Sequence, residues 1–247
     1  MVSGTTGSIK CVMKFVTGPD CHALIQRNSH RSVVHGLREA DARISTVCPK
    51  FNSDYNVFMP VDVGQIQHAL DEKQDINLVI ITSPTYEGFT ADVTAIGKLC
   101  KAKGITLVVD GAHGSLFPFI PELFPVSGIG IDGVDIVIQS LHKAAGSLSQ
   151  CSIVHLNKTS TKSAFALELA LFQGTTTSPS SLMLMSMEET VISSFINEVA
   201  RKRIRNTVQS AIRLTTLLSQ NSNVEILDHS SPKDPTKICF RVKNNQG

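Results

Sequence analysis

The chain has 247 residues, of which 42% are hydrophobic, and its 23 Lys and Arg against 21 Asp and Glu give a net charge of +2. This composition supplies a large core, excludes a disordered chain, and gives no electrostatic basis for binding nucleic acid. No apolar run is long enough to span a bilayer, and residues 1–7 lack the basic and apolar blocks of a secretory signal peptide.

The first part of the chain predicts alternating helices and strands. Residues 4–8, Gly-Thr-Thr-Gly-Ser, precede a helix expected over 9–16. Free N–H groups at a helix start can bind an anion, although an ordinary helix cap explains these residues equally well. A strand over 22–27 and a helix ending near Ala40, capped by Asn28 or Ser29, should follow. A strand over 42–48 and a loop over 51–60 are expected next.

Three buried strands are expected in the middle of the chain. They are apolar runs at 76–81, 105–109 and 134–139; a helix expected over 63–70 precedes the first run, and one expected over 91–103 separates the first two. Each run ends in a polar cluster, at residues 82–86, 110–113 and 140–143. Since continuous apolar strands alternating with helices are typical of a doubly wound parallel sheet, the three clusters should lie at the carboxyl ends of its strands.

The last third predicts an antiparallel or edge strand over 152–156, a helix over 163–172 and a hydroxyl-rich loop over 174–180. A long helical stretch over 182–218, in two or more pieces, carries a basic cluster at 201–205 that we interpret as a solvated face. Short strands are expected at 224–227 and 238–242. We predict two units: residues 1–205 as a large domain and residues 206–247 as the start of a truncated α+β domain.

Six cysteines are scattered, with no Cys-x-x-Cys pair. They predict reduced, mostly buried thiols and a cytoplasmic protein, or an organellar one if a longer natural chain carries a targeting segment. A zinc site built from Asp110, His113 and His142 is a weak alternative, because no short ligand spacing supports it.

Lys143 follows a buried strand and precedes small residues, a setting in which a desolvated amine can react with an aldehyde. A solvated lysine is the ordinary explanation of such a residue alone. Pyridoxal 5′-phosphate (PLP) needs a lysine, a carboxylate for its ring nitrogen, a phosphate cup and a flat group over its ring. Lys143, Asp110, residues 4–8 and His30 offer these in order, so the set favours PLP.

These motifs resemble the fold-type I Orn/Lys/Arg decarboxylases, the bacterial-type basic amino-acid decarboxylases. The likeness runs from about residue 3 to 190, and more faintly through 234–237 to the end. It is carried by residues 4–8, 27–32 with 36–37, 82–88, 110–114, 139–143 and 176–180. The resemblance implies a three-layer α/β large domain with a mostly parallel sheet. Because the family's Pro-Gly-His-Lys segment and most of its C-terminal part are absent, we expect a fragment of such a protein.

The resemblance also implies a role for each site residue. Lys143 would carry PLP as an aldimine, Asp110 would pair with the pyridine nitrogen, Ala112 would pack under the ring, and His30 would stack on its other face. His113 is expected to contact the cofactor. The phosphate would be held by the remaining predicted residues, Thr5, Thr6, Ser140 and His142, with Thr177 reaching the phosphate of a neighbouring subunit.

The implied protein is a homodimer or larger homo-oligomer that decarboxylates lysine, ornithine or arginine to an amine, as in polyamine biosynthesis. Two residues depart from the branch it most resembles: Gly111 replaces a usual Glu, and Ser181 a usual Tyr. Two alternatives remain open. One is another fold-type I activity, such as an aminotransferase or aldolase, and the other is a catalytically silent PLP-binding partner of a full-length relative.

Overall fold

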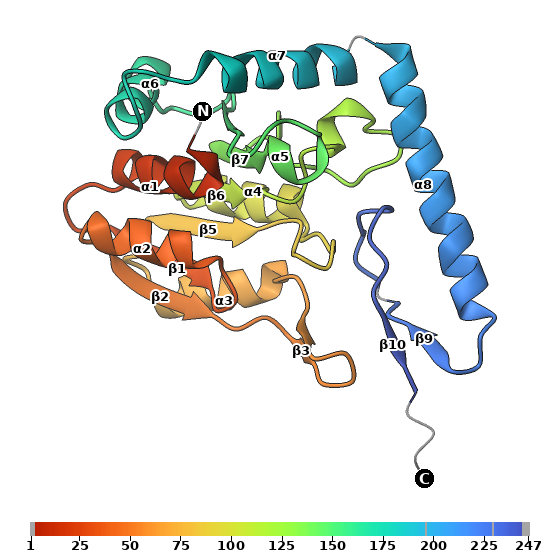
Figure 1. Ribbon diagram of the computed structural model, residues 1–247. Helices are drawn as coiled ribbons and strands as arrows, with labels where there is room; N and C mark the ends of the chain where they lie inside the picture. The colour runs from red at the N-terminus through yellow and green to blue at the C-terminus, as the bar shows by residue number, and fades with distance from the viewer. Residues whose placement is uncertain (1–2, 196, 229, 244–247) are drawn as a thin grey trace.

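A six-stranded sheet forms the centre of the computed structural model, which describes residues 3–195, 197–228 and 230–243 (Figure 1). Its strands lie in the order β2 (Arg43–Val47), β1 (His22–Gln26), β5 (Leu78–Thr82), β6 (Thr106–Asp110), β7 (Ile136–Ser140) and β8 (Ser152–Leu156). Neighbours are parallel from β2 to β7, whereas β8 is antiparallel and lies at the edge. The predicted mostly parallel sheet and the predicted edge strand are confirmed.

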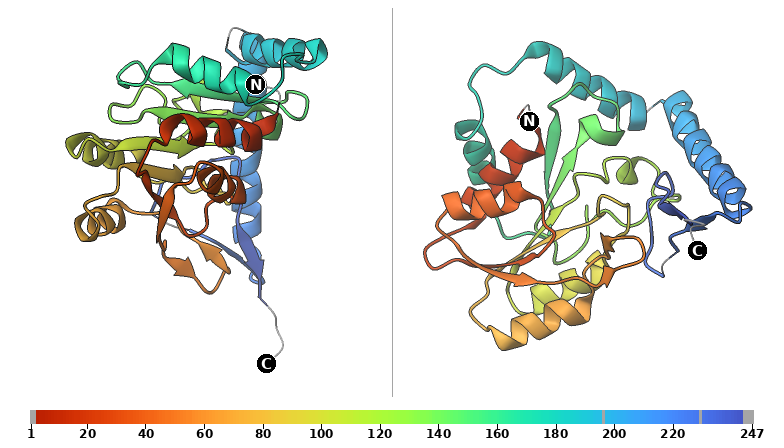
Figure 2. Two further views of the ribbon diagram at one scale, coloured as in Figure 1. Left: turned by 90° about the vertical axis from the view of Figure 1, so that its left-hand side faces the viewer. Right: turned by 60° about the horizontal axis from the view of Figure 1, so that its bottom comes forward.

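Helices cover both faces of this sheet, as Figure 2 shows. One face packs against α1 (Gly4–Val16), α2 (Arg31–Glu39) and α6 (Ala164–Gln173), and the other against α3 (Val63–Glu72) and α4 (Val93–Ala102). Successive residues of one strand serve opposite faces: Val108 points to the α1 side, and its neighbours Leu107 and Val109 point to the α4 side. This alternation explains why the strand sequences are apolar throughout, and it produces three layers.

Three local expectations were wrong. Helix α1 begins at Gly4 instead of residue 9, because Gly4 adopts a φ of 63° and its N–H donates to the Gln150 carbonyl. The cap of α2 is His30, whose Nδ1 accepts the Ser32 N–H, and neither Asn28 nor Ser29. The expected loop over 51–60 contains a small hairpin, β3 (Phe51–Asn52) with β4 (Val57–Phe58).

Beyond the sheet, the chain forms the predicted long helical stretch in two pieces, α7 (Ser181–Phe195) and α8 (Glu198–Ser219). The short strands β9 (Val224–Ile226) and β10 (Phe240–Val242) pair antiparallel beside α8 (Figure 1). The predicted boundary after residue 205 falls inside α8, where the helix continues without a break. The division into two units stays a prediction.

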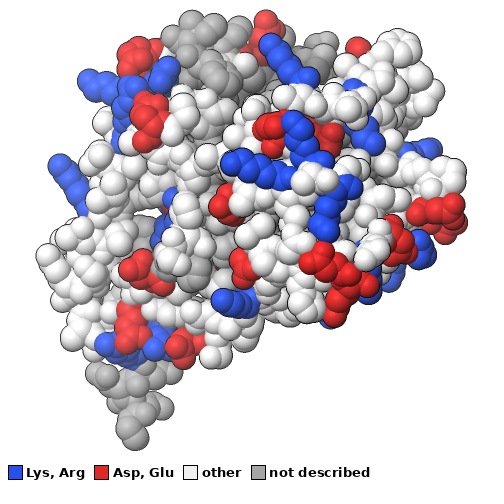
Figure 3. Space-filling model, turned by 180° about the vertical axis from the view of Figure 1, so that it is seen from behind, with Lys and Arg blue, Asp and Glu red and all other residues white. Residues whose placement is uncertain are grey.

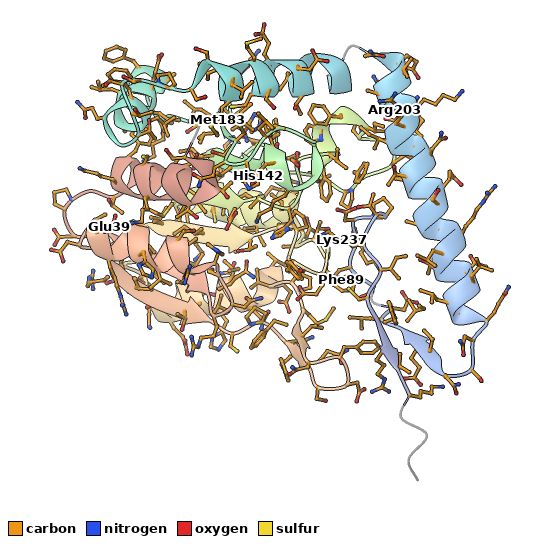
Figure 4. The ribbon with its side chains drawn as sticks, viewed as in Figure 1. Glu39, Phe89, His142, Met183, Arg203 and Lys237 are labelled. Atoms are coloured by element: carbon orange, nitrogen blue, oxygen red, sulfur yellow. The ribbon has the colours of Figure 1, made fainter. Side chains whose placement is uncertain are left out.

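The 230–239 segment folds back onto the loop that follows β5. The Thr90 N–H donates to the Pro232 carbonyl at 2.9 Å, and the Asp234 N–H donates to the Gly88 carbonyl at 2.8 Å. Figure 4 shows Phe89 and Lys237 close together where the two segments meet. A side chain at Gly88 would lie 2.8 Å from Lys237 Cγ, so glycine permits this close approach. The contact brings the C-terminal region to the carboxyl edge of the sheet.

The cysteines and the surface charges agree with what the composition predicts. All six cysteines are free, and four of them are buried. In Figure 3, Lys and Arg are interspersed with Asp and Glu over the face that is shown. Among the described residues, no helix combines the length and the apolar character needed to cross a membrane.

Candidate functional site

The polar clusters after β5, β6 and β7 meet at one edge of the sheet. Thr82 is in register with Asp110, Asp110 is in register with Ile138, and Ser140 ends the next strand. Since these strands are parallel neighbours, their carboxyl ends open into a common cavity of about 620 Å³. The cavity is closed on a further side by the start of α1.

Lys143 enters this cavity from α5 (Leu141–Ala144), a single helical turn directly after β7. Its Nζ lies 3.1 Å from Nε2 of His113. Burial lowers the pKa of Lys143, Lys237 lowers it further, and the nearby Asp110 opposes both. A larger share of this amine is therefore neutral and nucleophilic than for a fully solvated lysine.

His113 is held neutral beside this lysine. Burial, together with the positive charges of Lys143, Lys237 and His30, lowers the pKa of His113 to about 4. The neutral ring accepts a hydrogen from Lys143 through Nε2. Its edge meets the Tyr86 ring at 5.4 Å between centroids, with the planes at 88°.

Asp110 is buried at the inner end of the cavity, with only 2% of the residue exposed. Burial raises the pKa of its carboxyl, while the Ala112 N–H, at 3.2 Å from Oδ1, and the charges of Lys143 and His30 lower it. That N–H is the one hydrogen bond which the described residues give this carboxylate. A cationic N–H of a ligand would therefore find an acceptor here.

The start of α1 forms the opposite end of the cavity. The N–H groups of Thr5 and Thr6 lie in its first turn, where a helix leaves them without helical partners. His142 lies beside them: a Cβ atom placed on Gly4 would be 4.0 Å from His142 Cε1. Its Nδ1 donates to the Cys151 carbonyl at 2.8 Å. First-turn amides and the helix dipole suit an anion such as a phosphate.

Two contacts hold α1 in this place. The hydroxyls of Ser8 and Ser152 are hydrogen bonded at 2.7 Å in the buried layer between α1 and β8. The Gly4 N–H bonds the Gln150 carbonyl at 3.0 Å. The first turn of α1 is thus fixed to the loop and strand that follow Lys143.

Eight of the ten predicted residues line the cavity: Thr5, Thr6, His30, Asp110, Ala112, His113, His142 and Lys143. Ser140 does not, but its hydroxyl lies 3.2 Å from the His142 ring. Thr177 lies in the exposed loop between α6 and α7, away from this cavity. The structure brings the eight together, and the individual roles stay predictions.

Sequence reasoning assigned no role to several residues of the cavity. Tyr86 and Thr82 line it, together with Asn28 and Gln150. Thr82, Tyr86 and Asn28 lie in segments that carry the family resemblance, which is a usable signal; Gln150 lies in none. The Gln26 amide holds two of them, accepting the Thr82 N–H and donating to Asn28 Oδ1 at 3.3 Å.

The cavity fits PLP on its own chemistry. It offers an amine of lowered pKa, a buried carboxylate for a ring nitrogen, and helix N–H groups for a phosphate. The buried Thr82 Oγ1 has no hydrogen-bond partner among the described residues, so a polar ligand could satisfy it. Within the same residues, no group of three His, Cys, Asp or Glu is arranged to hold a metal ion, and the zinc alternative gains no support.

Comparison with known proteins identifies relatives of the whole chain. Residues 1–246 match the family model described as Orn/Lys/Arg decarboxylase, major domain. The chain is 30% identical to the arginine decarboxylase of Bacillus anthracis and to the uncharacterized protein YaaO of Bacillus subtilis (strain 168), each over 98% of its length. It spans 50% and 51% of those two proteins, about half the length of the curated relatives it matches.

Solved structures show the same fold. The constitutive lysine decarboxylase of E. coli superposes with a TM-score of 0.78 at 20% identity, over 96% of this chain and 39% of that one. Lysine decarboxylase A from Pseudomonas aeruginosa gives a TM-score of 0.79 at 16% identity, over 98% and 40%. These matches confirm the predicted fold-type I architecture.

Proposed function

This chain belongs to the Orn/Lys/Arg decarboxylase family, whose members depend on PLP, and we propose that it is the PLP-binding portion of a decarboxylase of lysine, ornithine or arginine. The observation that carries this proposal is the meeting of Lys143, His113 and Asp110 in one cavity from the ends of β6 and β7. The family match and the arginine and lysine decarboxylases among its relatives support the substrate class.

We assign each residue of the site a separate contact with PLP, except Ser140, which supports His142. Lys143 supplies the amine that bonds the cofactor, and Asp110 supplies the acceptor for a protonated ring nitrogen. Ala112 and His30 provide the two sides for the ring, and Thr5, Thr6 and His142 provide the anion site, with Ser140 supporting His142. When bound, PLP supplies the electron sink that lets the substrate lose carbon dioxide.

His113 contacts the amine that would bond the cofactor. Because His113 is neutral, its Nε2 can accept a hydrogen bond from Lys143 Nζ at 3.1 Å and so orient that amine.

We propose a second copy of this chain as its partner. Helices α6 and α7 expose apolar side chains on both sides of the loop that holds Thr177, namely Phe165, Leu169, Phe172, Leu182, Leu184 and Met185. Phe165 alone is 76% exposed. Apolar patches of this kind on a folded protein mark association sites, and covering this one would place Thr177 in an interface. Light scattering should give a mass of at least two chains, and a monomer at micromolar concentration would contradict this.

The purified chain tests the function directly. It is incubated with PLP and separately with lysine, ornithine and arginine, and released carbon dioxide and amine are measured. We expect one substrate to be preferred. Covalently held PLP with no amine from any of the three would support the silent PLP-binding alternative.

The Lys143→Ala variant tests the cofactor site. We expect it to lose covalent PLP completely, as measured by borohydride reduction and mass spectrometry, because Lys143 is the only lysine among the described residues that line the cavity. Lys202→Ala on α8 is the matched control and should retain the full label. Labelling of Lys143→Ala at the level of the unchanged protein would refute the assignment.

A further inference from the structure

Lys237 is the charged residue of the 230–239 segment that reaches toward the Lys143 site. Its Nζ lies 5.4 Å from the centroid of the Tyr86 ring, on the loop after β5. The Tyr86 ring in turn meets the His113 ring edge-on, and His113 bonds Lys143. One chain of contacts therefore joins Lys237 to the reactive amine.

The Tyr86 ring depends on these two neighbours for its position. It is 74% exposed and lies on the wall of the cavity, so it has little packing of its own. A cation over one face and an imidazole against its ring restrict where it can point. Backbone hydrogen bonds to Gly88 and Thr90 fix the 230–239 segment to the 85–90 loop. These bonds hold Lys237 near the Tyr86 ring.

We propose that Lys237 is a positioning residue of the Lys143 site, which holds the Tyr86 ring against His113 at the wall of the cavity. The inference rests on the proposed function, because the site it serves is the proposed PLP site. A segment that follows Lys143 by about ninety residues would then complete that site.

Besides contacting Tyr86, Lys237 carries a positive charge that acts on two titratable groups of the site. It lowers the pKa of both His113 and Lys143. The other charged groups that act on this pair are Asp110 after β6 and His30 at the start of α2. Of these, Lys237 alone lies outside the sheet region, and it favours the uncharged lysine that attacks an aldehyde.

Lys233 supplies a matched control. It lies in the same segment, and its Nζ lies 5.6 Å from the centroid of the Phe89 ring. It does not contribute to the pKa of His113 or Lys143. Lys233→Met therefore removes a cation over an aromatic ring in the same segment, away from the site.

The first measurement follows His113 in PLP-free protein by NMR titration, with the signal assigned through its loss in His113→Gln. Lys237→Met should raise the pKa of His113 by about half a pH unit, as expected for loss of one partly solvated charge nearby. Lys237→Arg and Lys233→Met should leave it unchanged. This result stands even if the chain binds no PLP, so failure of the proposed function and failure of the inference are separable.

The second measurement follows the rate at which Lys143 captures PLP, trapped by borohydride. Lys237→Met should slow capture about threefold, which corresponds to half a pH unit in the neutral fraction of Lys143. The inference is wrong if Lys237→Met matches the unchanged protein, or if Lys233→Met has the same effect on either readout.

Tyr86 variants keep the inference testable if Lys237→Met does not fold. Tyr86→Leu removes the ring and should slow capture, whereas Tyr86→Phe keeps the ring and should capture PLP at the normal rate. Normal capture by Tyr86→Leu would overturn the positioning role.

Discussion

The sheet region, residues 4–157, and the C-terminal region, residues 164–243, bury their apolar residues to very different extents. Every residue of β1 and β7 is buried, and so are four of the five in β5 and in β6. By contrast, α6 and α8 each bury a single described residue, Leu167 and Val208. The long α8 instead exposes apolar residues such as Leu214 and Leu217.

The difference teaches where stability and chemistry reside. The sheet region has two hydrophobic layers of its own, and these fix the strand ends that carry the cavity. Apart from α6, which packs on the sheet face through Leu167, the C-terminal region joins it at small clusters, in which Val208 lies with Phe117 and Leu227 with Phe89. We therefore expect substitutions of the same kind to have unequal effects in the two regions.

The largest contrast should come from paired leucine truncations. Leu107 is fully buried in β6, so Leu107→Ala should lower the free energy of unfolding by about 2–5 kcal/mol, from lost burial and the cavity left behind. Leu217 is 64% exposed on α8, so Leu217→Ala should change it by no more than about 0.5 kcal/mol. Urea unfolding measures both. Equal losses would show that α8 is as tightly packed as the sheet.

Acid should weaken the sheet region through His155 in β8. Burial lowers the pKa of His155 to about 4, so the unfolded chain binds its proton more readily. The stability that the neutral ring contributes is complete above about pH 6.5 and is lost as pH falls toward 4, amounting to about 1–2 kcal/mol at pH 5. Thermal unfolding at pH 7.5 and 5 should show this loss.

Two histidine variants sharpen that prediction. His155→Gln should reduce the loss of stability between pH 7.5 and 5. His68→Gln, at an exposed position on α3, should leave the full loss in place. An unchanged pH dependence in His155→Gln would assign the acid sensitivity to another group.

Helix caps should give the smallest contrast. Asp62 accepts the Gln65 N–H in a capping box at the start of α3, and Asp62→Ala should lower the free energy of unfolding by about 1 kcal/mol. Asn197 caps α8 through the Val199 N–H, but α8 buries only Val208 among its described residues, so Asn197→Ala should cost only a few tenths of a kcal/mol. Urea unfolding compares them, and a larger loss for Asn197→Ala would reverse the contrast between regions.

The sequence predicted the central strands well because β5 and β6 have no solvent-exposed face. The runs at 76–81 and 105–109 are apolar throughout, and such runs bounded by turn residues indicate buried strands. The β3–β4 hairpin was missed because two-residue strands carry no periodicity. The start of α1 was missed because a carbonyl from residue 150 holds Gly4, and local sequence cannot report a partner so far away.

The same reasoning explains the site. Residues at strand ends, such as Asp110 and Lys143, could be predicted because their places follow from the sheet. Tyr86 lies in a motif that carries the family resemblance, but its contact with Lys237 depends on how the 230–239 segment folds back. Gly111 stands where the family branch usually has Glu, and its surroundings here are tight. A Cβ atom at this position would lie 3.3 Å from the Ile138 carbonyl oxygen.

The attachment of α1 to residues 150 and 152 has a consequence for biosynthesis. The ribosome synthesises the turn at residues 4–8 before the partners that hold it, which follow it by more than 140 residues. Until then the start of α1 lacks its hydrogen-bond partners Gln150 and Ser152, and the proposed site for the vitamin-derived cofactor is incomplete. Translation must therefore pass β8 before loading can begin, so a ribosome stalled upstream of that strand should yield only unloaded chains.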